Sequence, residues 1–318
     1  MQGIIKKPRV LGIVGATASG KTAVSLEVAQ LLGGEILCMD SMQIYQRMDI
    51  GTAKPTAQEQ AAVPHHMLDL IPPEASYSAA EYTALAHQTI AEVIARGHIP
   101  MLVGGTGLYL QGLSQPMDYG GLPSDPAVRG SLQQKLAEKG NLALHAELAA
   151  IDPPSAARLH PNDTRRIIRA LEIYQLTGLP MSAHRTPTAA DSPYAFMLFA
   201  VDWPRETLHQ RINLRVDQMM EQGLQNEVDQ LLASGVPRDA QSMQGLGYKE
   251  LLPVLLDGAP LRPAVEQIKT GTRNYARRQL IWFRRDQRIR WLPSYQLKNA
   301  KDQIIQAWED PDSWISMH

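Results

Sequence analysis

The sequence has little of several features on which whole classes of protein depend. Cys38 is the only cysteine among 318 residues, which excludes a disulfide framework and a cysteine-rich zinc site. No apolar run approaches the roughly 20 residues needed to cross a bilayer, and residues 1–9 are too polar and basic for a signal peptide. The formal net charge is only −1, so the chain as a whole has no excess of positive charge. We therefore expect a cytoplasmic protein that contacts no membrane.

Positive charge is nevertheless concentrated in two short segments. Residues 273–290 contain seven arginines and one aspartate, and residues 158–169 contain four arginines and one aspartate. Because the whole chain carries a net charge of −1, the remainder is acidic. Two basic segments on an acidic body predict a localised site for a polyanion.

The segment GATASGKT matches a phosphate-binding loop. It follows an apolar run at 9–14, typical of a buried strand, and precedes a helical pattern at 23–32. In this setting the backbone N–H groups of the loop surround a phosphate at a helix N-terminus. The loop predicts a ligand with a di- or triphosphate, as in ATP-binding proteins, but it does not recognise what the phosphate is attached to. Its residues are Gly15, Ala16, Thr17, Ala18, Ser19, Gly20, Lys21, which would reach the terminal phosphate, and Thr22, which would hold Mg²⁺.

Two other predicted strands end on polar residues. The strand at 35–39 is followed by Asp40, and the strand at 99–103 by Gly104, Gly105 and Thr106. Ligands of parallel sheets bind outside the carboxyl ends of the strands, so both side chains should lie near the phosphate loop. Asp40 would suit a general base, with a helix N-cap or a magnesium ligand as alternatives. Thr106 offers a hydroxyl group, unless it only caps the next helix.

The remaining pattern predicts an α/β fold with a helical insertion. A helix at 78–96 has Ser78 as its cap and Glu81 at the capping-box position. Turn-rich linkers at 115–123 and 180–193 enclose a segment without strand character. We therefore predict a parallel-sheet core from residues 1–115 and 195–318, and an all-helical insertion domain at 116–194. The strand at 195–201 returns to the sheet, and helices are predicted at 125–139, 141–150, 153–159, 162–177, 204–222, 224–233, 247–256 and 261–286.

Arginines recur at helical spacing in these segments. Arg211 and Arg215 lie one turn apart, so both can project toward one spot. In the helix at 261–286 the arginines form a stripe in which Tyr275, Trp282 and Phe283 are interleaved. Arginine and aromatic faces suit unstacked bases as well as phosphates. The alternative for both this helix and the one at 162–177 is that aromatic or apolar residues fill the core and the arginines are merely solvated.

Taken together, these motifs resemble those of the bacterial tRNA dimethylallyltransferases. The resemblance covers nearly the whole chain and is far more specific than the phosphate loop alone. One departure is Ala16, where the family usually has proline; this position presents only backbone to a phosphate. The matching motifs are GATASGKT, Asp40-Ser41 with Ile44-Tyr45, residues 48–55, Gly104-Gly105-Thr106, Asp125-Pro126 with Arg129, residues 160–163, residues 169–172, Gly247-Tyr248, and Arg278-Gln279 with Trp282.

The resemblance implies a specific reaction and a P-loop kinase-like core. A dimethylallyl group would pass from dimethylallyl pyrophosphate to N6 of adenosine 37, next to the anticodon of tRNA. Asp40 would be the base, and Thr106 would contact the bridging oxygen of the leaving group. Lys21, Arg215 and Thr22 with Mg²⁺ would stabilise the departing diphosphate. A small-molecule kinase and a nucleic-acid-binding NTPase remain as alternatives, although no clear acidic Walker-B strand end supports an ATP-driven motor.

The resemblance also implies where tRNA is bound, by a protein that we expect to be monomeric. The two basic segments, found from charge alone, overlap this set. The implied tRNA-binding residues are Asp40, Ser41, Met42, Gln43, Thr106, Arg129, Arg165, Arg166, Ile167, Ile168, Arg169, Gln244, Gly245, Leu246, Gly247, Tyr248, Lys249, Arg277, Arg278, Gln279, Leu280, Ile281, Trp282, Phe283 and Arg284.

Overall fold

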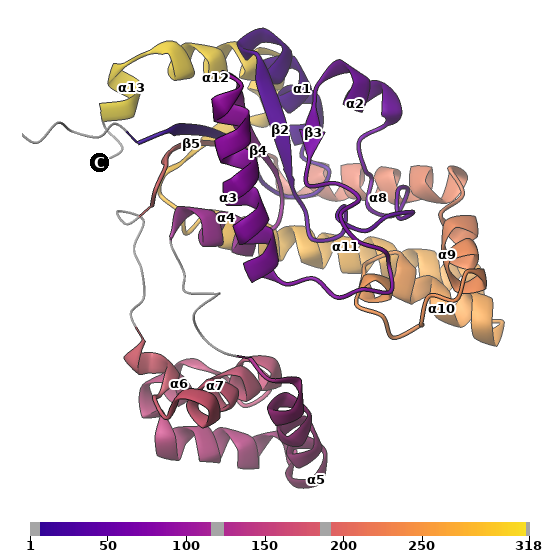
Figure 1. Ribbon diagram of the computed structural model, residues 1–318. Coiled ribbons are helices and arrows are strands. Elements are labelled where there is room, and N and C mark those ends of the chain that lie inside the picture. The colour runs from indigo at the N-terminus through magenta and orange to yellow at the C-terminus, as the bar shows by residue number, and fades with distance from the viewer. Residues whose placement is uncertain (1–6, 116–123, 185–191, 316–318) are drawn as a thin grey trace, which may run out of the picture. The chain divides into compact units, whose positions relative to one another are not determined.

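Six strands, each parallel to its neighbours, form a central sheet in the order β3-β2-β4-β1-β5-β6. The computed structural model describes residues 7–115, 124–184 and 192–315 (Figure 1). The strands β1, β2 and β4 are buried along almost their whole length, which explains why their sequences are continuous apolar runs. The predicted α/β fold class is confirmed. The strands are β1 (Arg9–Val14), β2 (Gly34–Met39), β3 (His65–His66), β4 (Ile99–Gly104), β5 (Ala195–Asp202) and β6 (Ile289–Pro293).

The position of β1 determines where a ligand can bind. This strand lies between β4 and β5. The connection from β1 to β2 runs toward one edge of the sheet, whereas the connection from β4 to β5 runs toward the other edge. A crevice forms outside the carboxyl ends of the strands at such a switch point. The phosphate loop follows β1 there, Asp40 follows β2, and Gly105 with Thr106 follows β4.

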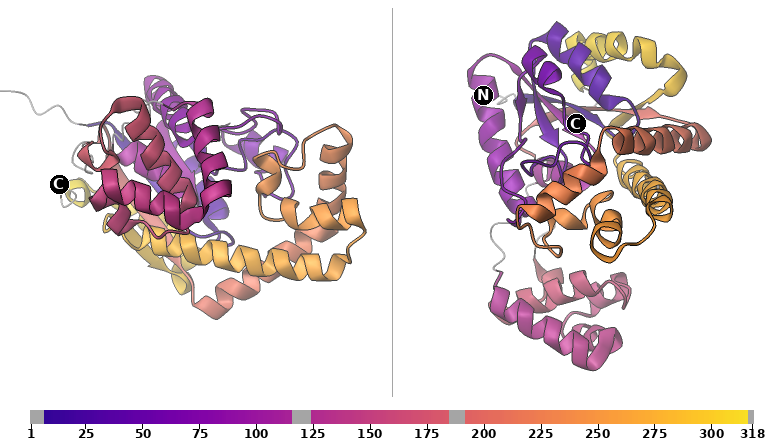
Figure 2. Two further views of the ribbon diagram at one scale, coloured as in Figure 1. Left: turned by 90° about the horizontal axis from the view of Figure 1, so that it is seen from below. Right: turned by 90° about the vertical axis from the view of Figure 1, so that its right-hand side faces the viewer.

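Helices cover both faces of the sheet. Because right-handed crossovers in opposite directions place their helices on opposite faces, α1 (Lys21–Leu32) and α3 (Ala79–Ala95) lie on different sides of the strands (Figures 1 and 2). The predicted capping box of Ser78 and Glu81 is present at the start of α3. Alongside these pack α4 (Gly107–Ser114) and α12 (Ala300–Glu309), while α2 (Ala57–Ala62) and α13 (Asp312–Ile315) are short.

The C-terminal helices build a second apolar cluster, which includes Ile44, Tyr45 and Met48 from the loop after β2. Figure 2 shows α8 crossing α11, and the two helices pack against each other. None of the described helices is apolar enough over a sufficient length to cross a membrane. The elements are α8 (Arg205–Glu221), α9 (Leu224–Ala233), α10 (Tyr248–Asp257), α11 (Leu261–Phe283) and the 3₁₀ turns η3 (Ser242–Gln244) and η4 (Ser294–Asn299).

The chain divides into two units, one of residues 1–114 and 192–318 and the other of residues 115–191. The smaller unit has its own apolar cluster around Leu144, Leu148 and Ile167. The predicted break between helices 125–139 and 141–150 is present within α5, as a kink at Gly140, whose φ of 79° and ψ of 170° are not helical. Most of the predicted linker at 115–123, and residues 185–191 of the second linker, lie outside the described residues. The elements are α5 (Pro126–Ile151), α6 (Pro153–Arg158), α7 (Thr164–Thr177) and the 3₁₀ turn η1 (Met181–Ala183).

Candidate active site

The phosphate loop is held in shape by groups from distant parts of the chain. Gly15, Ala18 and Gly20 have φ values of 136°, 60° and 89°, which turn the backbone into a cradle before α1 begins at Lys21. Trp203 Nε1 donates to Ser19 O at 2.9 Å, and Arg211 Nε donates to Ala18 O at 2.8 Å. The cradle is therefore fixed from outside and does not depend on a ligand for its form.

Inside the loop, one buried polar group has no partner. The Ser19 hydroxyl is buried and makes no hydrogen bond within the described residues. Lys21 Nζ donates to Ala16 O at 3.1 Å, which folds its side chain back over the loop. Unpaired buried hydroxyl groups are costly, so this donor fits a cradle that is completed by an acceptor such as a phosphate oxygen.

Asp40 and Thr106 are brought together at the ends of β2 and β4. Thr106 Oγ1 accepts from the backbone N–H of Ser41 at 3.1 Å, so its side chain braces the turn after Asp40 and does not cap α4. Asp40 Oδ1 accepts from the N–H of Met42 at 2.8 Å, and Oδ2 has no hydrogen-bond partner in the described chain. No helix begins at Asp40, so the N-cap alternative is wrong.

Gln279 of α11 joins this turn to the phosphate loop. Its Oε1 accepts from Thr17 N at 2.9 Å, and its Nε2 donates to Gly105 O at 2.9 Å. A Cβ at Gly105 would lie 2.1 Å from Gln279 Nε2, so only glycine allows this approach. Tyr275 lies one turn away on the same face of α11, where burial and the charge of Asp40 raise its pKa. One helix thus positions both halves of the site.

A cavity of about 330 Å³ connects the phosphate loop with Asp40. Lys21 and Arg215 lie in its wall, and their charges face the same space as the Asp40 carboxylate. Burial lowers the pKa of Lys21 to about 8, Arg215 acts in the same direction, and Asp40 opposes both effects. Predicted site residues in this wall are Thr17, Lys21, Thr22, Asp40, Ser41, Met42, Gln43, Arg215, Gln244, Gly245, Leu246, Gly247, Lys249, Arg278 and Gln279.

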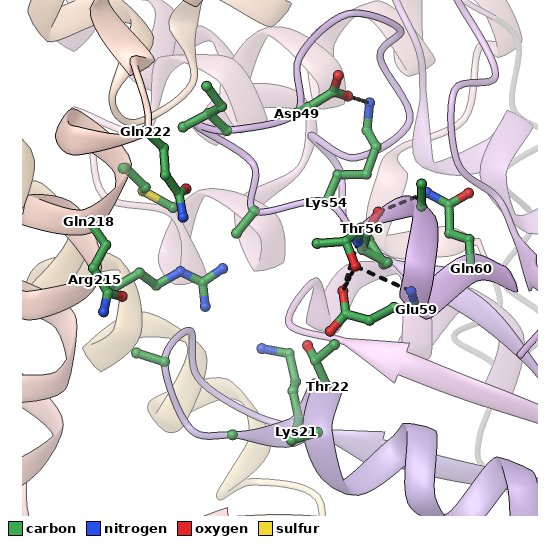
Figure 3. Close-up of a pocket in the computed structure, with 18 of the residues that line it drawn as sticks. Lys21, Thr22, Asp49, Lys54, Thr56, Glu59, Gln60, Arg215, Gln218 and Gln222 are labelled. Atoms are coloured by element: carbon green, nitrogen blue, oxygen red, sulfur yellow. Dashed lines mark hydrogen bonds and ion pairs between the residues drawn. The ribbon is translucent and has the colours of Figure 1, made fainter. Parts of the chain in front are cut away.

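A second cavity of about 960 Å³ lies on the other side of Lys21 and Thr22. Figure 3 shows the side chains of Lys21 and Arg215 pointing into the same space from α1 and α8. Arg211 lines this cavity too, but its guanidinium is bonded to the loop and stacked 4.4 Å from the ring of Trp203. Arg211 and Arg215 thus both line the larger cavity, but their charged groups are not directed at one spot; only Arg215 also reaches the cavity with Asp40.

Four apolar or aromatic side chains expected to contact tRNA are buried, which corrects the expectation of side-chain contacts for them. Ile167 and Ile168 fill the core of the smaller unit, Tyr248 lies in the C-terminal apolar cluster, and Phe283 packs under the sheet. These side chains stabilise the helices on which exposed arginines stand. Trp282 is half-buried against Gly107, whereas Arg277, Leu280, Ile281 and Arg284 line a different surface from the two cavities.

In the smaller unit, a buried carboxylate organises two of the expected arginines. Glu172 is fully buried and accepts from Arg129 at 3.0 Å and from Arg169 at 2.9 Å. Although burial alone would raise the pKa of Glu172, hydrogen bonds from Arg169 and Arg129 hold it below its ordinary value. Arg165 and Arg166 are exposed on α7, which leaves the helix with a basic outer face.

Comparison with known proteins places this arrangement in a family. The profile of the family described as IPP transferase matches residues 43–286, which include Gln43, Thr106, Arg215 and the whole of α11. The chain belongs to the IPP transferase family. A relative from Pelotomaculum thermopropionicum, named tRNA dimethylallyltransferase, is 47% identical over 287 residues, which cover 90% of this chain and 91% of the relative.

Solved structures of IPP transferases share the fold. The full-length tRNA isopentenylpyrophosphate transferase from Bacillus halodurans is 40% identical, with a TM-score of 0.70 and coverage of 95% of this chain and 96% of that one. A eukaryotic dimethylallyltransferase acting on tRNA is 29% identical, with a TM-score of 0.79 and coverage of 95% and 79%. The likeness to structures that contain the same P-loop kinase-like core confirms that part of the expected fold.

One buried carboxylate beside the site of this IPP transferase was not predicted from the sequence. Glu227 of α9 is buried and accepts from the backbone N–H groups of Asp49, Ile50 and Gly51 at 2.8, 2.7 and 3.1 Å. It also accepts from the Tyr248 hydroxyl at 2.6 Å. Glu227 thereby ties the loop beside the larger cavity to the start of α10, whose preceding residues line the cavity with Asp40. No local pattern marks it, because its partners lie far away in the sequence.

We expect Glu227→Gln to loosen this junction. An amide presents an NH₂ group where the native carboxylate accepts from backbone donors, so hydrogen bonds to a charged acceptor are lost. The free energy of unfolding should fall by about 2–4 kcal/mol, measured by chemical denaturation. The matched control is Glu221→Gln, which changes an exposed glutamate at the end of α8. Equal stability of the two variants would contradict the role given to Glu227.

Proposed function

We propose that this protein transfers the dimethylallyl group of dimethylallyl pyrophosphate to N6 of adenosine 37 of tRNA, next to the anticodon, and releases pyrophosphate. The observation that carries the proposal is the single cavity that joins a phosphate loop to an unpaired carboxylate oxygen of Asp40. Prenyl transfer needs a cradle for a diphosphate leaving group and a base for the nucleophile, and this cavity offers both. Membership of the IPP transferase family supports the same choice.

On the nucleophile side, we propose Asp40 as the general base. The lone pair of N6 attacks C1 of the allylic substrate, and the proton of N6 passes to the free carboxylate oxygen of Asp40. Asp40 Oδ1 stays bonded to Met42 N, which keeps Oδ2 directed at one place. The target base must leave the anticodon stack to reach this position. Tyr275 and Arg278 in the cavity wall provide an aromatic and a guanidinium face against which it can stack.

On the leaving-group side, the C1–O bond breaks and its electron pair leaves with pyrophosphate. The loop N–H groups and the side chains of Lys21 and Arg215, which line both cavities, are the donors available to this charge. We propose that Thr106, at the end of β4, contacts the bridging oxygen. Its hydroxyl can donate there, because in the Ser41 hydrogen bond it only accepts.

The described residues fit a magnesium ion that arrives with the substrate. Thr22 is exposed at the first turn of α1, and no group of three or more His, Cys, Asp or Glu residues within the described ranges could hold a metal ion. Mg²⁺ prefers phosphate oxygens and water with few protein ligands, so Thr22 would supply one ligand. Bound Mg²⁺ would neutralise part of the charge that develops on the diphosphate.

The proposal is tested by incubating the protein with labelled dimethylallyl pyrophosphate, Mg²⁺ and unmodified tRNA. We expect label to enter tRNA at one adenosine, and no label to enter a tRNA with guanosine at position 37. ATP with tRNA serves as the second arm. Hydrolysis of ATP that is stimulated by RNA, without transfer of the label, would favour a nucleic-acid-binding NTPase and contradict the proposal.

The lowered pKa of Lys21 predicts how substrate affinity depends on pH. Because Lys21 titrates near pH 8, its charge is present below that pH and lost above it. The affinity for dimethylallyl pyrophosphate should fall roughly tenfold between pH 7.5 and 9.5, a range in which the diphosphate is already ionised. Isothermal titration across this range measures the effect. Lys21→Arg keeps its charge and should show a nearly flat profile; a parallel decline in that variant would assign the titration to another group.

A further inference from the structure

One wall of the cavity with Asp40 is formed by side chains from a single face of the sheet. Alternate residues of a strand point to the same face, so Ile36 and Cys38 of β2 share a face with Asp40, which follows the strand, and all three line the cavity. Val103 of β4 is in register with Cys38 and lines the cavity beside it. Leu37, between them, points away and does not line it. An apolar floor, formed by Ile36, Cys38 and Val103, thus adjoins Asp40.

This floor carries no charge and is suited to a hydrocarbon group. Its three side chains are buried. Burial raises the pKa of Cys38, and the charge of Asp40 adds to the shift, so the thiol is uncharged and behaves as a small hydrophobic group. Ser25 of α1 also lines the cavity, but its hydroxyl donates to Thr22 O at 2.8 Å and needs no partner from a ligand.

The apolar floor is short. At a rise of about 3.3 Å per residue, Cys38 lies about 7 Å and Ile36 about 13 Å from Asp40 along the strand. His65 of β3, in register with Ile36, lines the cavity next to it, and its Nδ1 donates to Val63 O at 2.7 Å. A hydrocarbon chain that extended past the floor would cover this polar ring, which is unfavourable without a new hydrogen bond. The floor therefore favours a short chain.

The other apolar part of the cavity wall belongs to the C-terminal helices. Val216 comes from α8 and Ile268 from α11, and α11 also carries Tyr275 and Arg278, the side chains proposed to stack on the adenine base. The base and the hydrocarbon group must both fit into a cavity of about 330 Å³. With the base on the side of α11, the space along β2 and β4 is left for the hydrocarbon group.

We propose that Ile36, Cys38 and Val103 hold the hydrocarbon tail of the allylic donor and limit its length to about that of a dimethylallyl group. The proposal rests on the proposed function for the identity of the donor. These residues would determine specificity and orient C1 between the phosphate loop and Asp40, without contact to the diphosphate. The thiol of Cys38 would not compete for C1, because only a thiolate is a good nucleophile.

The first test enlarges the floor. Val103→Ala removes two methyl groups, and isothermal titration with Mg²⁺ then compares dimethylallyl pyrophosphate with its homologue in which one methyl group is replaced by ethyl. We expect the wild type to bind the homologue at least about tenfold more weakly and Val103→Ala to lose most of that preference, because one methylene in an apolar pocket is worth about 10–200-fold. The control Val10→Ala makes the same change at a buried position of β1 outside this cavity and should keep the preference.

The second test fills the floor. Cys38→Leu places a larger side chain beside Val103 and should weaken the binding of dimethylallyl pyrophosphate by at least about tenfold. Inorganic pyrophosphate has no tail, so its affinity should stay at the wild-type value. That value would also show that the variant is folded and that its phosphate loop is intact.

The outcomes separate this proposal from the proposed function, because the titrations need neither tRNA nor transfer. An unchanged preference in Val103→Ala, with transfer by the wild type, would overturn the role of the floor and leave the reaction standing. Equal weakening of both probes in Cys38→Leu would overturn the role given to Cys38. A protein that shows the expected preferences but transfers no prenyl group to tRNA would overturn the reaction alone.

Discussion

Replacing Asp40 by Asn is expected to reduce kcat for dimethylallyl transfer by about 10²–10⁴-fold, the contribution of a positioned general base. Asparagine keeps the shape of the side chain and can still accept from Met42 N through Oδ1. It cannot take a proton from N6, so the amine would have to be deprotonated by water. Single-turnover transfer of label into tRNA, with both substrates saturating, measures the step directly.

Binding of tRNA should change little in the same variant. Asp40 occupies a small part of the cavity wall, and its loss of charge removes repulsion toward RNA phosphates rather than an attraction. We expect a dissociation constant within a few-fold of the wild type. Asp229→Asn, an exposed position on α9, serves as the control with no effect on either quantity. Normal turnover of Asp40→Asn would remove Asp40 from the role of base.

The sequence predicts the half of the site that is encoded locally. The phosphate loop needs only a strand, a turn and a helix in succession, and β1 and α1 supply them within 24 residues of chain. Asp40 and Thr106 could be paired in advance because parallel strands end at one edge of a sheet. The register of β2 with β4 places Met39 beside Gly104, so the residues that follow each of them meet.

The other half depends on contacts that no short pattern carries. Glu227 lies 178 residues from Asp49, and Gln279 lies 262 residues from Thr17. Helical spacing correctly places Arg211 and Arg215 on one side of α8, but it does not say that Arg211 is occupied by a loop carbonyl. The same limit applies to Phe283, since periodicity alone does not decide which aromatic side chain is covered by the sheet. The strands β3 and β6 were not predicted; β3 has only two residues, and β6 carries charge.

Lys21→Met should lower kcat by about 10²–10³-fold, the loss seen when one preorganised donor to a developing anion is removed. The Lys21 ammonium lies in the wall shared by both cavities, beside the loop that would hold the diphosphate. Its charge matters most when the C1–O bond breaks, because the leaving group then gains negative charge that the bound substrate did not have. The rate of pyrophosphate release in single-turnover experiments measures this step.

Arg215→Gln should act on the same charge, so a double-mutant cycle with Lys21→Met tests whether the two residues work together. The charge of Arg215 lowers the pKa of Lys21 by repulsion, and a bound diphosphate relieves that repulsion. Because the two cations would act on one leaving group, removing the first already loses part of what the second contributes, and the combined loss in kcat should be smaller than the product of the single losses. Arg215→Lys, which keeps a charge on α8, should recover part of the rate. If both single variants instead raised KM for dimethylallyl pyrophosphate and left kcat intact, the two cations would serve only to bind the ground state.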